Sequence, residues 1–131
     1  MTSKDFSGIR EEGPLPDPAA VTLPEDFSDF LDDYIESTES QLHELEQAIL
    51  RFETAQTREQ DAAEIRRILH KIKGESGMVG LDDMSTLVHE VESAFELIAE
   101  DRAADMLFRF TDWTTAALAG MIANNANQAK E

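Results

Sequence analysis

The stretch "ILHKIKGESGMVG", residues 68–80, places a histidine beside basic side chains and glycines in a chain that otherwise has the pattern of helices. A neutral imidazole is a competent nucleophile near pH 7 when one ring nitrogen is accessible. Gly74 and Gly77 lie about one and two helical turns beyond His70, so neither raises a side chain beside the ring. Glycine in a helix interior costs roughly 0.5–1 kcal/mol relative to alanine. We interpret the bare surface as room for another protein's active site to approach His70.

The hydrophobic period of this segment predicts that His70 is exposed. At about 100° per residue, His70 lies roughly 150° from the centre of the apolar stripe. That stripe consists of Ile65, Ile68, Leu69, Ile72 and Val79. Arg66 and Lys73 lie beside His70 on the outward face, where Lys73 can offset the roughly two negative charges of a phosphoryl group on the ring. The alternatives are close helix packing through the glycines and ordinary solvated charges.

Four amphipathic segments predict an all-α protein. Apolar residues recur at helical spacing over about residues 25–52, 57–79, 81–98 and 102–125. The third segment begins at "LDDMS", where an aspartate can cap the helix. No strand pattern competes. Because short connections favour antiparallel neighbours, we expect an antiparallel up-down four-helix bundle.

The domain organisation is predicted from the prolines. All four of them lie within residues 1–24, which have no hydrophobic period, and we expect a flexible, partly extended leader there. Residues 25–127 are assigned to the bundle and 128–131 to a C-terminal tail. The leader and the ending "NNANQAKE" favour a standalone protein over an excised domain.

Composition excludes several classes of function. The net charge of −17 argues against nucleic acid and against anionic lipid surfaces as partners. The chain has no cysteine, so it has no disulfide and no thiolate metal site. No run approaches the roughly 18 apolar residues of a membrane span, and the start lacks the apolar region of a secretory signal. We therefore expect a cytoplasmic protein.

The second segment carries a resemblance to a known family. "LHKIKGESGMVGL" resembles the signature of histidine phosphotransfer (HPt) domains, H-x-x-K-G followed by small residues and a further glycine. In that family the histidine accepts and donates a phosphoryl group. The histidine, lysine and first glycine match His70, Lys73 and Gly74. The resemblance covers about residues 27–122, and the first segment, "FLDDYIESTESQLHELEQAILRFE", also fits it.

The third segment extends the resemblance. "LVHEVE" is similar to a motif in the HPt domain of chemotaxis-type histidine kinases, whose histidine and glutamate match His89 and Glu92. Glu92 lies about 100° from the core centre of its helix. A carboxylate there could accept a hydrogen bond from one ring nitrogen of His70, fix the tautomer and leave the other nitrogen free. We expect at most an accessory role for His89 and assign none to His43.

The partners follow from what the chain lacks and from the resemblance. No glycine-rich nucleotide-binding loop occurs and an ATP-binding kinase domain would not fit, so the chain cannot phosphorylate His70 alone. The resemblance implies a monomeric phosphotransfer intermediate between a sensor or hybrid histidine kinase and a response-regulator receiver domain. It also implies that the receiver supplies an aspartate and Mg²⁺, while the chain has no cofactor or metal of its own. Arg66, Gly74 and Gly77 are the expected partner-binding residues.

Other functions are weighed against this hypothesis. The chain could be the detached phosphoacceptor domain of a chemotaxis-type kinase, or a helical adaptor without phosphochemistry. A di-iron bundle is disfavoured because no Glu-x-x-His occurs. A dimerising kinase core is disfavoured because Lys71, and not an acidic residue, follows the histidine.

Overall fold

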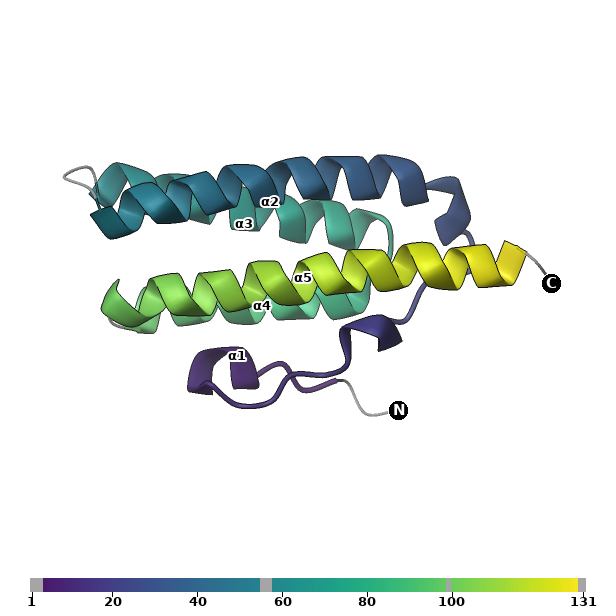
Figure 1. The fold of residues 1–131 in the computed structure, drawn as a ribbon, viewed down its shortest axis with the longest axis horizontal. Helices are drawn as coiled ribbons and strands as arrows, with labels where there is room; N and C mark the ends of the chain where they lie inside the picture. The colour runs from purple at the N-terminus through teal and green to yellow at the C-terminus, as the bar shows by residue number, and fades with distance from the viewer. Residues whose placement is uncertain (1–3, 55–57, 99, 130–131) are drawn as a thin grey trace.

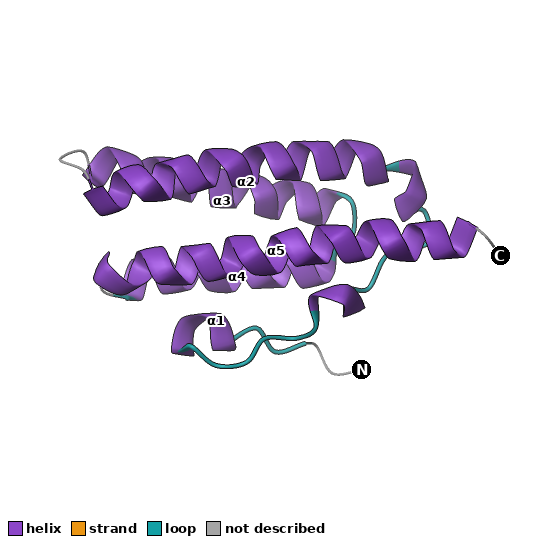
Figure 2. Cartoon of the chain, viewed as in Figure 1, coloured by secondary structure: helices purple, strands orange, loops and turns teal. Residues whose placement is uncertain are grey.

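The computed structural model describes residues 4–54, 58–98 and 100–129, and within these ranges it contains helices and no strands (Figure 2). The predicted all-α class is therefore confirmed. The short elements are α1 (Gly8–Glu11) and the 3-10 turns η1 (Pro18–Ala20) and η2 (Phe27–Asp29). The long helices are α2 (Leu31–Thr54), α3 (Arg58–Met78), α4 (Asp82–Leu97) and α5 (Glu100–Ala129). None of the described helices is long and apolar enough to cross a membrane.

The four long helices lie side by side along the long axis of the molecule (Figure 1). α2 packs against α3 and α5, and α4 packs against the same two helices. Figure 1 shows the chain direction alternating from one long helix to the next. Residue 57, the expected start of the second helix, lies outside the described residues. α5 continues to Ala129, past its expected end near residue 125.

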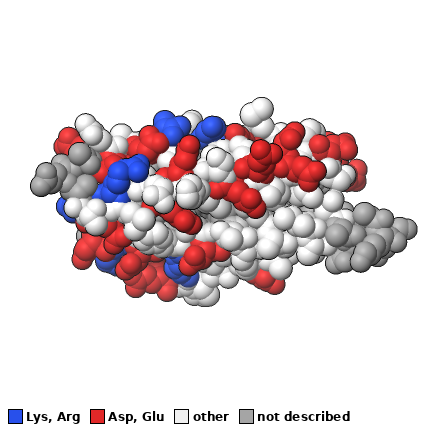
Figure 3. All heavy atoms as spheres, turned by 45° about the horizontal axis from the view of Figure 1, so that its top comes forward, with Lys and Arg blue, Asp and Glu red and all other residues white. Residues whose placement is uncertain are grey.

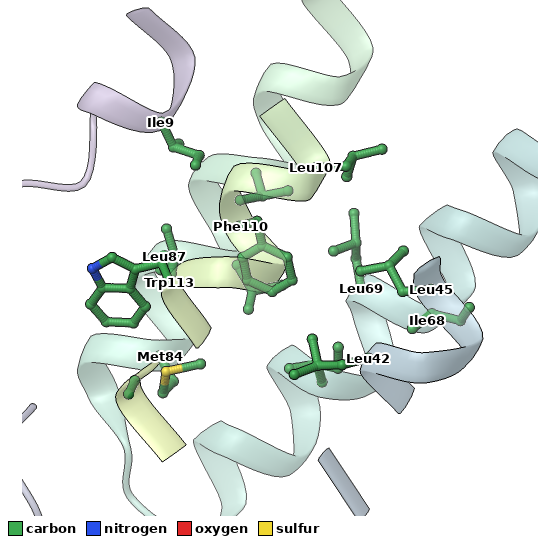
Figure 4. Packing of buried hydrophobic residues seen from close by; sticks show 14 of the residues in the cluster. Ile9, Leu42, Leu45, Ile68, Leu69, Met84, Leu87, Leu107, Phe110 and Trp113 are labelled. Carbon is green, nitrogen blue, oxygen red and sulfur yellow. The ribbon is translucent and has the colours of Figure 1, made fainter. Parts of the chain in front are cut away.

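The core is one apolar cluster to which all four long helices contribute. Phe110 of α5 is fully buried, and Figure 4 shows it between Leu87 of α4 and Leu69 of α3. The stripe predicted for α3 is confirmed at four positions that are at most 1 % exposed: Ile65, Ile68, Leu69 and Ile72. Val79, predicted in the same stripe, is half-buried and lies just beyond the end of α3.

Gly80 ends α3 for a structural reason. Its φ of +82° lies in the left-handed region, which side chains other than glycine rarely adopt. Leu81 N–H donates to the Ser76 carbonyl at 2.9 Å and Gly80 N–H to the Gly77 carbonyl at 3.2 Å, the pair of bonds that closes many helix C-termini. This glycine therefore shapes the turn into α4.

The start of α4 differs from its prediction. Leu81 is the N-cap residue, and no side-chain cap forms there. The Asp83 carboxylate instead accepts hydrogen bonds from Lys4 Nζ at 2.7 Å and from Thr22 N–H at 2.9 Å. One of the two aspartates of this stretch thus binds the N-terminal segment.

That segment corrects the prediction of a flexible leader for residues 4–24. Phe6 is 2 % exposed and meets the Trp113 ring edge-on, with 5.3 Å between the ring centroids. Trp113 Nε1 donates to the Pro16 carbonyl at 2.8 Å, and the Arg109 guanidinium donates to the Gly8 carbonyl at 2.8 Å. Figure 1 shows the segment along α4 and α5. Isolated apolar side chains anchor it, which is why no hydrophobic period revealed the packing.

Candidate functional site

His70 lies on the outward face of α3. Its side chain is 77 % exposed, whereas Ile68 and Ile72, on the opposite face, are buried. The predicted exposure of His70 is therefore confirmed. A ring presented in this way can be reached by a bulky partner, which a buried histidine could not be.

Glu92 of α4 connects His70 with Lys73. Its Oε1 lies 2.6 Å from Lys73 Nζ, and its Oε2 lies 3.7 Å from His70 Nδ1. The side chains of Glu92 and Lys73 are only 24 % and 29 % exposed, so the pair between α3 and α4 is half-buried and less screened than a surface pair. The structure thus brings together three residues that the sequence analysis selected.

The contact between Glu92 and the ring is looser than predicted. A distance of 3.7 Å exceeds the roughly 2.7–3.2 Å of a nitrogen–oxygen hydrogen bond, so the expected bond is not formed. The carboxylate nevertheless faces Nδ1. Neither ring nitrogen makes a hydrogen bond to a residue that the structure describes, but Nε2 also has no charged group of these residues facing it. It is therefore the nitrogen that the chain leaves open to a partner.

His89 and Arg66 border the same site. Both line a groove of about 340 Å³ between α3 and α4 that also contains Lys73 and Glu92. His89 is exposed and the structure gives it no contact with His70. Arg66 Nε of α3 lies 2.5 Å from Glu96 Oε1 of α4. Arg66 is therefore paired with Glu96 and not with His70. The structure brings both residues near the site without assigning either a role.

The two glycines on the His70 face have no packing function. A Cβ built on Gly74 would meet nothing within 4 Å, and one on Gly77 would meet only Ser85 Oγ at 3.9 Å, an ordinary contact. The alternative that they allow close helix packing therefore has no support. They leave a bare surface around His70.

A polar cluster on the α2 side of His70 was missed. Gln41 Nε2 donates to Ser37 Oγ at 2.9 Å and to Glu75 Oε2 at 2.8 Å, and Ser37 Oγ donates to the same Glu75 oxygen at 2.9 Å. Tyr34 OH and Ser76 Oγ are 2.7 Å apart nearby, and burial raises the pKa of Tyr34 above its ordinary value. Gln41 is a polar residue within the apolar stripe of α2, and this is the signal that could have revealed the cluster.

The described residues contain no group of three or more histidine, aspartate or glutamate side chains that could hold a metal ion. The site consists of an exposed imidazole, a carboxylate that faces it, and an ammonium group on the other oxygen of that carboxylate. An accessible imidazole of this kind can act as a nucleophile.

Comparison with known proteins agrees with this description. The family model of the Hpt domain matches residues 29–125, and the chain belongs to this family. The match supports a histidine phosphotransfer function in a phosphorelay. It spans α2 to α4 and most of α5, and it leaves out the packed N-terminal segment. No curated protein and no solved structure matches the chain.

Proposed function

We propose that this protein accepts a phosphoryl group on Nε2 of His70 and exchanges it with an aspartate of a response-regulator receiver domain. The observation that carries the proposal is the 77 % exposure of His70, combined with a carboxylate that faces only Nδ1. We also propose that the long helices form the up-down antiparallel bundle expected of the family. We further propose a monomer in the cytoplasm, phosphorylated directly or through a receiver by a sensor or hybrid histidine kinase.

The transfer is a displacement at phosphorus. The Nε2 lone pair forms the phosphorus–nitrogen bond while the bond from phosphorus to the aspartate oxygen breaks and the carboxylate leaves. The proton on Nδ1 stays in place, and the Glu92 carboxylate 3.7 Å away stabilises the positive charge that develops on the ring. The reverse reaction returns the phosphoryl group. Mg²⁺ on the receiver would neutralise charge on the phosphoryl oxygens.

Lys73 has two effects in this mechanism. Its ammonium, 2.6 Å from Glu92 Oε1, holds the carboxylate in position beside the ring. It also lies about one turn from His70 on the same side, where it attracts the incoming phosphoryl group. Arg66, Gly74 and Gly77 would contact the partner, and His89 would have at most an accessory part.

The second candidate is the phosphoacceptor domain of a chemotaxis-type kinase. The observation that favours it is the link from Lys73 through Glu92 to His70, because Glu92 belongs to the "LVHEVE" motif that resembles those kinases. The site chemistry would be the same. The donor would be the ATP-bound domain of the kinase and not a receiver aspartate.

The test is phosphoryl transfer from receivers. Receiver domains encoded by the same genome are phosphorylated with labelled acetyl phosphate and Mg²⁺, freed of reagent, and mixed with the protein. The proposal predicts rapid transfer of label from at least one receiver, in an acid-labile and alkali-stable form. Absence of label from every receiver would contradict it, and an adaptor without phosphochemistry would give this result. Label acquired only from a kinase ATP-binding domain would favour the second candidate.

A further inference from the structure

A groove of about 410 Å³ lies between α2 and α3, on the side of α3 away from Glu92. It is lined by Asp33, Glu36, Ser37, Ser40, Gln41, Glu44 and Lys71. Lys71 directly follows His70, so the groove adjoins the face that the receiver must cover. Figure 3 shows acidic side chains gathered over the N-terminal half of α2, the helix that forms one wall.

One hydrogen-bond acceptor of the groove, on Gln41, has no donor within the described part of the chain. The side chain is 3 % exposed and lines the groove. Its amide nitrogen is identified by its bonds to Ser37 Oγ and to the Glu75 carboxylate, because a carboxylate can only accept. Its oxygen, Oε1, is therefore the other end of the amide, and it is buried with no hydrogen-bond partner among the described residues. Most buried acceptors in folded proteins have a hydrogen-bond donor.

The charges around the groove select the kind of donor. Asp33, Glu36 and Glu44 are exposed carboxylates of the lining, and Glu75 adds a carboxylate on the α3 side. Lys71 is the one basic residue of the lining, so the carboxylates outnumber the ammonium group. A neutral donor would satisfy Gln41 Oε1 but would leave the negative charge of the carboxylates uncompensated. A guanidinium or ammonium group satisfies both, since it carries several donors and a positive charge on a long stem.

The groove continues into an apolar surface. Phe30 and Met78 are 41 % and 87 % exposed, and both line a neighbouring hollow that shares Asp33 and Ser37 with the groove. Gly74 lies between this region and His70 and raises no side chain. A domain seated on His70 can therefore reach across Gly74 to the groove without obstruction.

We propose that the groove between α2 and α3 receives an arginine or lysine side chain of the receiver domain that docks over His70. The proposal rests on the proposed function, since it names a contact made by that same partner. The basic side chain donates to Gln41 Oε1 and pairs with Asp33 and Glu36. It sets the orientation of the receiver from one side of His70, while Lys73 and Glu92 act from the other.

The groove can be tested without a receiver by NMR on the full chain. N-acetyl-arginine amide is the probe, and N-acetyl-citrulline amide, which has the same shape without the charge, is its control. Saturable shifts of the Gln41 side-chain amide and the Glu75 backbone amide are expected with the arginine compound alone. Shifts that spread over all acidic residues without saturating, or that are equal for the two compounds, overturn the proposal, because the groove then does not select a positive charge.

The receiver is tested with matched variants. Asp33→Asn combined with Glu36→Gln should weaken binding of the receiver that labels His70 by roughly tenfold and reduce its salt dependence. The control, Glu53→Gln combined with Asp112→Asn, makes the same charge change at exposed positions outside the groove and should bind as the original protein does. Equal affinity of both double variants overturns the proposal. Loss of label from every receiver contradicts the proposed function instead, so the two failures are distinguishable.

Discussion

Glu92 makes a close contact with Lys73 and a looser one with His70. Its Oε1 is 2.6 Å from the Lys73 ammonium, which fixes the carboxylate, and its Oε2 faces the His70 ring at 3.7 Å without a hydrogen bond. Helical spacing was enough to predict an exposed His70, because the apolar stripe of α3 determines which side faces solvent. The hydrogen bond predicted between Glu92 and His70 is not formed, because the two atoms are 3.7 Å apart. The residue spacing along one helix does not determine the distance between two helices.

Replacing Lys73 with alanine should slow transfer to His70 on the order of tenfold, equivalent to about 1.4 kcal/mol of transition-state stabilisation. The change removes the positive charge nearest the phosphoryl group and releases Glu92. Helix α3 should stay folded, because alanine is a good helix former. Quenched-flow transfer rates and thermal unfolding measure the two effects. An unchanged rate would reduce Lys73 to a structural partner of Glu92.

Replacing Glu92 with glutamine tests the orienting carboxylate. The variant keeps the shape and loses the negative charge beside Nδ1, so transfer should slow by about threefold to tenfold, or roughly 0.6–1.4 kcal/mol. Glu96→Gln is the matched control, because Glu96 pairs with Arg66 and has no contact with His70. The role assigned to Glu92 would be wrong if the two variants transferred at the same rate.

At the scale of the element, α3 and the turn that follows it contain glycines with different roles. Gly80 has a φ of +82° and ends the helix, whereas Gly77 is exposed within it and would tolerate a Cβ. A sequence pattern shows three glycines at similar spacing and does not separate them. The separation depends on the backbone angle and on the approach of Ser85, which only the folded chain defines.

Gly77→Leu should keep or raise stability, since leucine is the better helix former by a substantial part of about 1 kcal/mol. It should weaken receiver binding, because the new side chain stands on the approach surface beside His70. Gly80→Ala should show the reverse: a loss of about 1–2 kcal/mol from the left-handed backbone, with normal affinity in the folded fraction. Thermal unfolding and receiver titration of both variants check this. A destabilised Gly77→Leu with normal binding would mean that this glycine is structural.

At the scale of the molecule, the N-terminal segment is part of the folded unit. Its Pro16 carbonyl accepts a hydrogen bond from Trp113, 97 positions away in the sequence. The long helices were predictable from their periodicity, whereas this segment has no period and its anchors lie on distant parts of the chain. The Gln41–Glu75 pair was missed for a similar reason. It joins the neighbouring helices α2 and α3, and the hydrophobic period of one helix does not show which residue of the next helix a polar side chain will contact.

Phe6→Ala should therefore destabilise the protein by roughly 3 kcal/mol, the usual cost of truncating a buried phenylalanine. Phe6 is 2 % exposed and packs on Trp113, so its removal leaves a cavity at the α5 surface. The transfer rate of the folded fraction should stay the same, because His70 lies on another helix. Denaturant unfolding measures the loss. A flexible leader, as first predicted, would give almost no change.

The most direct test of the central claim is the position of the label after transfer from a phosphorylated receiver. We expect one acid-labile phosphoryl group on His70 by mass spectrometry and none on His89 or His43. His70→Gln should take up no label and should unfold at the same temperature as the original protein, because an exposed side chain contributes little packing. Label that persists in His70→Gln, or that maps to another residue, would show that His70 is not the phosphoryl acceptor.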